Sequence, residues 1–139
     1  MLTVRARGRA ELSRVLETRG FERPAVAQAL DRLVREGWLD DLAAARAAVR
    51  SRAGRYGRVR MDRELSSRGF SAETIARALV ELTGAEEEAA LASVWKKLWK
   101  LHARLPREKR RRRVWNALLR RGFAADKVSE IMKGSDEVD

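Results

Sequence analysis

A six-residue pattern that occurs three times constrains the fold of this chain more than any other feature. The copies are Leu16–Phe21, Leu65–Phe70 and Leu118–Phe123, and each reads Leu-x-x-Arg-Gly-Phe. Their glycines are spaced by 49 and then 53 residues. Apolar residues recur eight positions before each glycine and six and ten positions after it: Leu12, Met61, Val114, Val26, Ile75, Val128, Leu30, Leu79 and Met132. This repetition predicts three copies of one supersecondary unit in tandem.

The end of each copy has the residues of a helix stop. A helix commonly ends with a glycine in the left-handed conformation, and the apolar residue after it packs back onto the last turn. We therefore expect each Phe to pack on the leading Leu of its copy, and the same stop to recur at Gly37, with Trp38 on Leu33. The repeat signature consists of Gly20, Phe21, Gly69, Phe70, Gly122 and Phe123.

A second helix is predicted directly after each stop, because apolar residues follow there at helical spacing. Ser71 is a candidate N-cap for one of these helices. Third helices are predicted from about 40 to 53 and from 86 to 104, and the third copy lacks one. The sequence after Met132 is polar and acidic, so we expect a frayed tail there.

Together these patterns predict an all-α protein of seven or eight helices. The helices are expected to form tandem three-helix repeats in an elongated curved array. No segment alternates apolar and polar residues between turn signals, as a half-buried strand would. The expected domains are a three-helix repeat over residues 1–56, a second over 57–104, and a partial third repeat with an acidic C-terminal tail over 105–139.

The sequence offers little for catalysis or metal binding. It has no cysteine and a single histidine, His102, which excludes a thiol nucleophile and a site with two His ligands in one chain. No phosphate loop, dinucleotide fingerprint or hydrolase motif is present. We interpret Asp40, Asp41 and the acids of 86–88 as helix N-caps and first-turn residues. We therefore expect no enzyme activity, no cofactor and no metal site.

The sequence also gives an expectation for location. It contains no apolar run of the length of a transmembrane helix. The first residues lack the apolar core of a signal peptide. We expect a cytoplasmic, monomeric protein that makes no membrane contact.

The chain is strongly basic, with 31 Lys and Arg against 20 Asp and Glu, a net charge of +11 and an isoelectric point near 11.2. This balance favours a polyanionic partner such as nucleic acid. Charge alone selects the candidate partner-binding residues, which are Arg46, Arg50, Arg52, Arg55, Arg58, Arg60, Arg107, Lys109, Arg110, Arg111, Arg112 and Arg113. A smaller basic group at the N-terminus consists of Arg5, Arg7 and Arg9.

Two of these features have alternative interpretations. The run 107–113 carries six cations, whose repulsion at i,i+4 spacing destabilises an isolated helix. An anionic partner would relieve that repulsion, and a solvated face of an arginine-rich protein accounts for the run equally well. Trp95, Trp99 and Trp115 could stack on bases, but we favour core packing because their neighbours are apolar.

The motifs together resemble those of the RecX family, regulatory proteins of bacterial recombination. The resemblance extends from about residue 5 to residue 133. It rests on the Arg-Gly-Phe stops and on the segments Arg9–Leu12, Gly37–Asp41, Val49–Arg52, Tyr56–Gly57 and Glu64–Leu65. Gly-Trp-Leu-Asp-Asp followed by Ser-Arg and Glu-Leu at this spacing is the specific part. One departure is Ala44, where the family often has Phe.

The resemblance implies a function. RecX proteins bind the filament that RecA forms on single-stranded DNA and lie in its helical groove across several protomers. They hinder filament extension or promote disassembly, which reduces strand exchange, ATP hydrolysis and co-protease activity. They have no catalytic site of their own. The partners implied here are therefore the RecA recombinase filament and, through it, single-stranded DNA.

Two other functions fit the residues. Paired helices with a sharp glycine turn also occur in helix-turn-helix proteins, so an independent, non-specific nucleic-acid-binding protein is the main alternative. A sequence-specific reader is less favoured, because Asn116 and Gln28 are the only amide side chains available to read bases. The third possibility is a helical scaffold for another protein.

Overall fold

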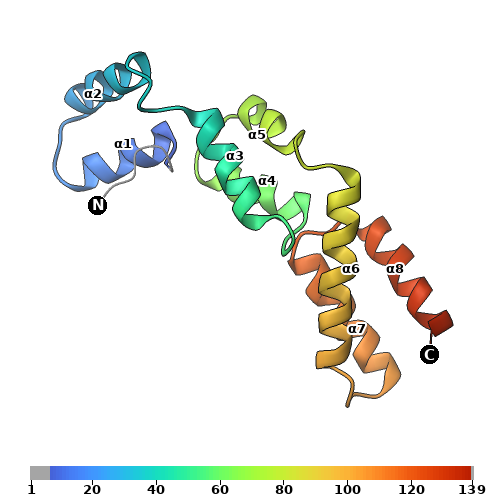
Figure 1. Cartoon of the computed structure of the whole chain (residues 1–139). Coiled ribbons are helices and arrows are strands. Elements are labelled where there is room, and N and C mark those ends of the chain that lie inside the picture. Colours follow the sequence, from blue (N-terminus) through green and yellow to red (C-terminus); the bar gives the residue numbers. More distant parts are fainter. Residues whose placement is uncertain (1–6, 139) are drawn as a thin grey trace. The chain divides into compact units, whose positions relative to one another are not determined.

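The computed structural model describes residues 7–138, with side chains over 7–134. All regular structure in this range is helical, which confirms the all-α class and the expected number of helices. The helices (Figure 1) are α1 (Arg9–Thr18), α2 (Arg23–Arg35), α3 (Asp41–Arg52), α4 (Arg58–Ser67), α5 (Ala72–Leu79), α6 (Gly84–Leu101), α7 (Arg107–Arg120) and α8 (Ala125–Val138).

The chain forms two compact units that are not continuous in sequence. The described part of the first unit comprises residues 7–51 and 63–81, and that of the second comprises 52–62 and 82–138. Helix α4 therefore gives its first residues to the second unit and its remainder to the first.

The helix stops form as the repeat predicts. In the first copy the N–H of Phe21 donates to the carbonyl of Leu16 at 3.1 Å, and the N–H of Gly20 donates to the carbonyl of Glu17 at 3.0 Å. The other two copies and the Gly37 stop repeat both hydrogen bonds. All four glycines have positive φ, between 77° and 96°. These paired bonds satisfy carbonyls that would otherwise lack a partner at a helix end.

The aromatic residues after the stops differ in burial. Phe70 and Phe123 are buried, whereas Phe21 is 57% exposed and Trp38 is 54% exposed. Phe21 and Trp38 therefore lie largely at the surface although their backbone stops form, and their packing on Leu16 and Leu33 stays a prediction. The difference has a cause within each unit: the start of another helix lies against the stops of Phe70 and Phe123, but the described residues place none against Phe21.

The repeated apolar positions form the core of each unit. All nine residues that the repeat selects are buried. In the first unit, Leu12, Val26 and Leu30 pack together with Leu39. In the second unit, α6, α7 and α8 lie side by side (Figure 1). The buried side chains of this unit form one cluster, which consists of Ala90, Leu91, Val94, Val114, Leu118, Phe123, Val128 and Met132. Three tryptophans pack against that cluster, Trp95, Trp99 and Trp115, which confirms their predicted role in packing.

Within the second unit, the start of α4 rests on the end of α7. The N–H of Gly57 donates to the carbonyl of Arg121 at 2.8 Å, and the N–H of Val59 donates to the carbonyl of Gly122 at 3.1 Å. A Cβ at Gly57 would lie 2.4 Å from the carbonyl oxygen of Gly122, and one at Gly122 would lie 2.2 Å from the Cβ of Arg60. Only glycines allow this approach, which we call the Gly57–Gly122 joint.

The first unit contains an equivalent contact between the start of α1 and the end of α4. A Cβ at Gly8 would lie 2.7 Å from the ring of Phe70, and one at Gly69 would lie 2.6 Å from the Cβ of Ala10. Gly8 and Gly57 are 49 residues apart, and Gly69 and Gly122 are 53 apart, which are the spacings of the repeat itself. We call this contact the Gly8–Gly69 joint.

The expected frayed tail after Met132 is wrong, because α8 continues to Val138. Gly134 does not adopt a positive φ, so no stop forms there. No proline follows Met132 to end the helix either. This polar segment therefore continues the helix and does not form an irregular tail.

We predict that Gly122→Ala lowers the free energy of unfolding by about 3 kcal/mol. The new Cβ would enter the backbone of Arg60, and the residue would be held at a φ of 88°. Urea denaturation followed by circular dichroism measures the loss.

Gly54→Ala is the matched control in the same unit. Gly54 has a φ of 89° but open space around it, so its replacement isolates the conformational cost, about 1 kcal/mol. Equal losses in the two variants would show that the close approach at the joint contributes nothing to stability.

Candidate functional site

Two of the candidate residues on α3, Arg46 and Arg50, contact an acid of their own unit. The Nε of Arg46 lies 2.9 Å from Oε1 of Glu81, and a terminal nitrogen of Arg50 lies 3.8 Å from the other oxygen of the same carboxylate. Arg50 remains 81% exposed. Their two positive charges are therefore partly balanced by one negative charge. Of the N-terminal group, Arg9 pairs with Asp31 at 2.7 Å, and Arg5 lies outside the described residues.

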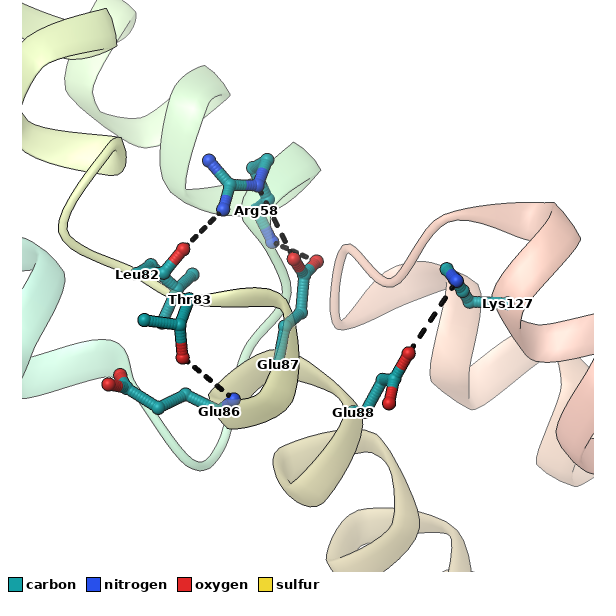
Figure 2. A network of polar contacts seen from close by, with 7 residues as sticks. All are labelled: Arg58, Leu82, Thr83, Glu86, Glu87, Glu88 and Lys127. Atoms are coloured by element: carbon teal, nitrogen blue, oxygen red, sulfur yellow. Dashed lines mark hydrogen bonds and ion pairs between the residues drawn. The ribbon is translucent and has the colours of Figure 1, made fainter.

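Arg58 ties the start of α4 to the start of α6 (Figure 2). Its guanidinium donates to the carbonyl of Leu82 at 2.7 Å and to Oε2 of Glu87 at 3.3 Å. Its backbone N–H donates to the other oxygen of Glu87, also at 3.3 Å. The carboxylate thus supplies a partner for an N–H that the first turn of α4 leaves unpaired. Arg58 therefore stabilises the contact between the start of α4 and the start of α6.

The remaining acids near the start of α6 also act locally. The hydroxyl of Thr83 accepts the N–H of Glu86 at 3.1 Å, which caps α6, and Glu88 lies 3.7 Å from Lys127 on α8 (Figure 2). The interpretation of residues 86–88 as acids of a helix start is confirmed. None of these contacts has the form of a catalytic site.

The adjacent aspartates, Asp40 and Asp41, accept backbone hydrogen bonds at the starts of α3 and α1, respectively. Oδ1 of Asp40 accepts the N–H of Ala43 at 3.1 Å, which confirms its interpretation as an N-cap. Oδ1 of Asp41 accepts the N–H of Arg9 at 2.8 Å. Asp41 therefore does for α1 what Glu87 does for α4. Sequence reasoning missed this second role, because nothing in the sequence links a first-turn acid to a helix 32 residues earlier.

Two members of the basic run on α7 are half-buried. The guanidinium of Arg110 lies over the Trp99 ring, 3.9 Å from its centroid, and donates to the Trp99 carbonyl at 3.0 and 2.7 Å. Arg111 donates to the carbonyl of Met132 at 3.3 Å. These side chains hold α7 against α6 and α8. One signal was available in the sequence: Arg110 stands one helical turn before Val114, on the buried face.

The other members of the run are exposed. Lys109, Arg112 and Arg113 form no ion pair with any side chain that the structure describes. Helical spacing continues this face through Asn116 and Arg120, which are exposed as well. We call the five residues the α7 stripe; Arg107, on the first turn, is also exposed. The stripe presents positive charge along one side of a helix about 20 Å long.

The last candidates gather around one aromatic ring in the second unit. Guanidinium carbons lie 4.3 to 5.9 Å from the centroid of the Tyr56 ring, and they belong to Arg52, Arg55, Arg60 and Arg121. We call these five residues the Tyr56 cluster. Arg121 was not among the charge-selected candidates, because it is distant in sequence from the others.

Two features, a metal-ligating group and a membrane-spanning helix, are absent from residues 7–138. No group of three or more His, Cys, Asp or Glu side chains there could hold a metal ion. No helix in that range is long and apolar enough to cross a bilayer.

Two family models match the chain. A model of the second three-helix domain of RecX matches residues 40–79, and a model of the third three-helix domain matches residues 86–132. The segment 40–79 contains α3 to α5, and the segment 86–132 contains most of α6, all of α7 and the first part of α8.

Curated relatives and solved structures agree with the family models. A protein named "Regulatory protein RecX" from Mycobacterium sp. (strain JLS) is 56% identical over 52 residues, which are 37% of this chain and 28% of that protein. One from Xanthomonas citri is 50% identical over 54 residues, 39% of this chain and 33% of that protein. The matched segments thus span a third or less of these relatives.

Among solved structures, RecX from Lactobacillus salivarius superposes with a TM-score of 0.78 at 19% identity, covering 94% of this chain and 86% of that one. A second structure, of regulatory protein RecX, gives a TM-score of 0.84 at 22% identity and covers 92% and 65%. At these identities the likeness shows the fold.

We predict that Arg110→Ala costs about 2 kcal/mol of unfolding free energy, because it removes a ring contact and two hydrogen bonds to a carbonyl. Arg112→Ala removes the same type of side chain two positions along the helix, where it is exposed, and is expected to cost nothing measurable. Urea denaturation of both variants makes the comparison. A loss of similar size in both would contradict a structural role for Arg110.

Proposed function

Because the chain belongs to the RecX family, we propose that it is a regulatory protein that binds the filament formed by RecA on single-stranded DNA. Binding inhibits the recombinase, the ATPase and the co-protease activity of that filament. The protein acts by occupying a surface and not by catalysing a reaction of its own.

The observation that carries the proposal is the α7 stripe, within the segment that matches the third RecX domain. A RecA filament on DNA presents a polyanion along its length, and an extended row of cations complements it. Repulsion within the stripe costs stability in the isolated protein and is relieved when phosphate or carboxylate groups approach. This supports a role for the exposed cations in binding a partner, in addition to keeping the protein soluble.

Tandem helical units suit a partner that itself repeats. Each three-helix domain presents its own surface, so neighbouring domains can engage neighbouring RecA protomers. Linked contacts of this kind bind more tightly than either contact alone. A protein bound across several protomers hinders both the addition of further protomers and the changes between protomers that accompany ATP hydrolysis.

The same stripe favours a second candidate function, independent and non-specific binding of nucleic acid. Exposed cations without partner carboxylates would bind DNA phosphates whether or not RecA is present. The two functions differ in what they require: the first needs RecA protomers for its effect, and the second needs only the DNA.

We predict that the protein, added well below the concentration of RecA, inhibits ATP hydrolysis by RecA on single-stranded DNA. A coupled ATPase assay measures this. The triple variant Lys109→Glu, Arg112→Glu, Arg113→Glu is expected to need at least about tenfold more protein for half-inhibition, since it reverses the exposed charge of the stripe.

The control is a second triple variant, Arg19→Glu, Arg35→Glu, Arg77→Glu. It changes the net charge by the same amount as the first, at exposed positions of the first unit. If the wild-type protein leaves hydrolysis unchanged but binds DNA tightly and salt-sensitively, the RecA proposal fails and the second candidate takes its place.

A further inference from the structure

The geometry points to a phosphate-binding site at the Tyr56 cluster, with the phosphodiester backbone of single-stranded DNA as its ligand. This deepens the proposed function, on which it rests, by naming the residues and the chemical group through which the protein meets DNA. The cluster lies wholly within the second unit. Its members come from the last residue of α3 and the turn after it, the first turn of α4 and the end of α7.

The first step is the density of charge. The guanidinium carbon of Arg60 lies 4.3 Å from the ring centroid, and those of Arg55 and Arg121 both lie 5.7 Å from it. Arg52 is the fourth, at 5.9 Å. All four charges therefore fit within a sphere about 12 Å across, comparable with the Debye length of about 8–10 Å at physiological salt. Over such a distance solvent does not screen them fully from one another.

The second step is that the cluster is held in place. Tyr56 is half-buried, and its ring attracts cations to its face. Arg121 donates to the carbonyl of Arg55 at 3.1 Å, and Arg60 donates to the carbonyl of Arg120 at 3.4 Å. A guanidinium has five N–H donors, so one arginine can bond to a carbonyl and to a ligand at the same time. Arginines fixed in this way lose less conformational entropy when they bind.

The third step is a comparison of the two joints. In the Gly8–Gly69 joint, Arg68 pairs with the carboxylate of Glu11 and lies 5.3 Å from the Phe70 ring. The position of Glu11, three residues after the first glycine of the joint, belongs to Arg60 in the Gly57–Gly122 joint.

The position of Arg68, just before the second glycine, belongs to Arg121. The two positions that hold an acid and an arginine in the first joint therefore both hold arginine in the second. An acid at this position is compatible with the joint, so the joint itself does not require the second arginine. The replacement of the acid by Arg60 adds the positive charge that an anion-binding site needs.

The fourth step identifies the anion. Arginine forks bind phosphate oxygens in pairs, and clusters of arginines are a common way of recognising phosphate. A single protein carboxylate would balance one of four charges, whereas a nucleic-acid strand supplies a phosphate at every nucleotide. The α7 stripe ends at Arg120, next to Arg121, so positive charge continues from the cluster along α7. This continuity favours an extended phosphodiester chain.

The test measures DNA binding without RecA. A fluorescein-labelled oligothymidylate is titrated with the full chain at several salt concentrations, and fluorescence anisotropy gives the affinity. Arg60→Glu gives the second joint the acid that the first joint has, opposite Arg121. We expect binding about tenfold weaker, and a salt slope smaller by about 0.7 for each phosphate that the variant no longer binds.

Arg77→Glu, at an exposed position of α5, is the control for the change in net charge, and is expected to alter the affinity less than about twofold. If Arg60→Glu does not fold, as judged by circular dichroism, Arg55→Glu carries the same test, because Arg55 is exposed and its side chain is not packed into the joint. Tyr56→Phe keeps the ring and should bind like the wild-type protein.

The outcomes separate this inference from the proposed function. Affinity and salt slope that match the Arg77→Glu control would overturn the phosphate site. If DNA binding is unchanged but inhibition of the RecA ATPase disappears, the cluster binds protein carboxylates, so the inference fails and the proposed function stands. Weakened DNA binding in Arg60→Glu supports the inference, even if the wild-type protein proves not to inhibit RecA.

Discussion

Hydrogen bonds between the start of one helix and the end of another hold the second unit together. The first N–H groups of a helix and its last carbonyls have no partner within the helix. At the Gly57–Gly122 joint, the start of α4 supplies donors and the end of α7 supplies acceptors, at 2.8 and 3.1 Å. The helix dipoles meet with opposite ends, which adds to the attraction. Both glycines are required because the backbones touch, and the buried Phe123 completes the contact.

The joint also explains how four arginines can gather in one place. The carbonyls of Arg55, in the turn after α3, and of Arg120, at the end of α7, both accept from arginines there. The end of a helix such as α7 favours cations. Arg60 and Arg121 each bond to such a carbonyl, and the Tyr56 ring offers a further weakly negative surface. Backbone polarity thus offsets part of a repulsion that the side chains alone would not tolerate. The groups that stabilise this contact are then the same groups that we propose bind an anion.

Much of this fold could be predicted from the sequence, because helix stops and apolar spacing are local signals. The stops at Gly20, Gly69 and Gly122 and the buried repeat positions followed from them. The roles of the arginines did not, since charge is the same whether a side chain binds a carbonyl, as Arg110 does, or faces solvent, as Arg112 does. A repeat also gives the number of residues from one unit to the next, but it does not say at which residue a unit begins. The domain boundaries at 56/57 and 104/105 stay predictions, while α6, α7 and α8 share one core.

The paired glycines have a consequence for anyone who would lengthen, shorten or recombine such an array. A helix that docks end to end on another is specified by two distant positions at once, neither of which tolerates a side chain. A fragment cut between helices and moved elsewhere would keep its amphipathic faces but would carry only one half of this pairing. A transferred segment must therefore include both facing glycines and the acid that caps the docked helix. That acid is Asp41 for α1 in one unit and Glu87 for α4 in the other.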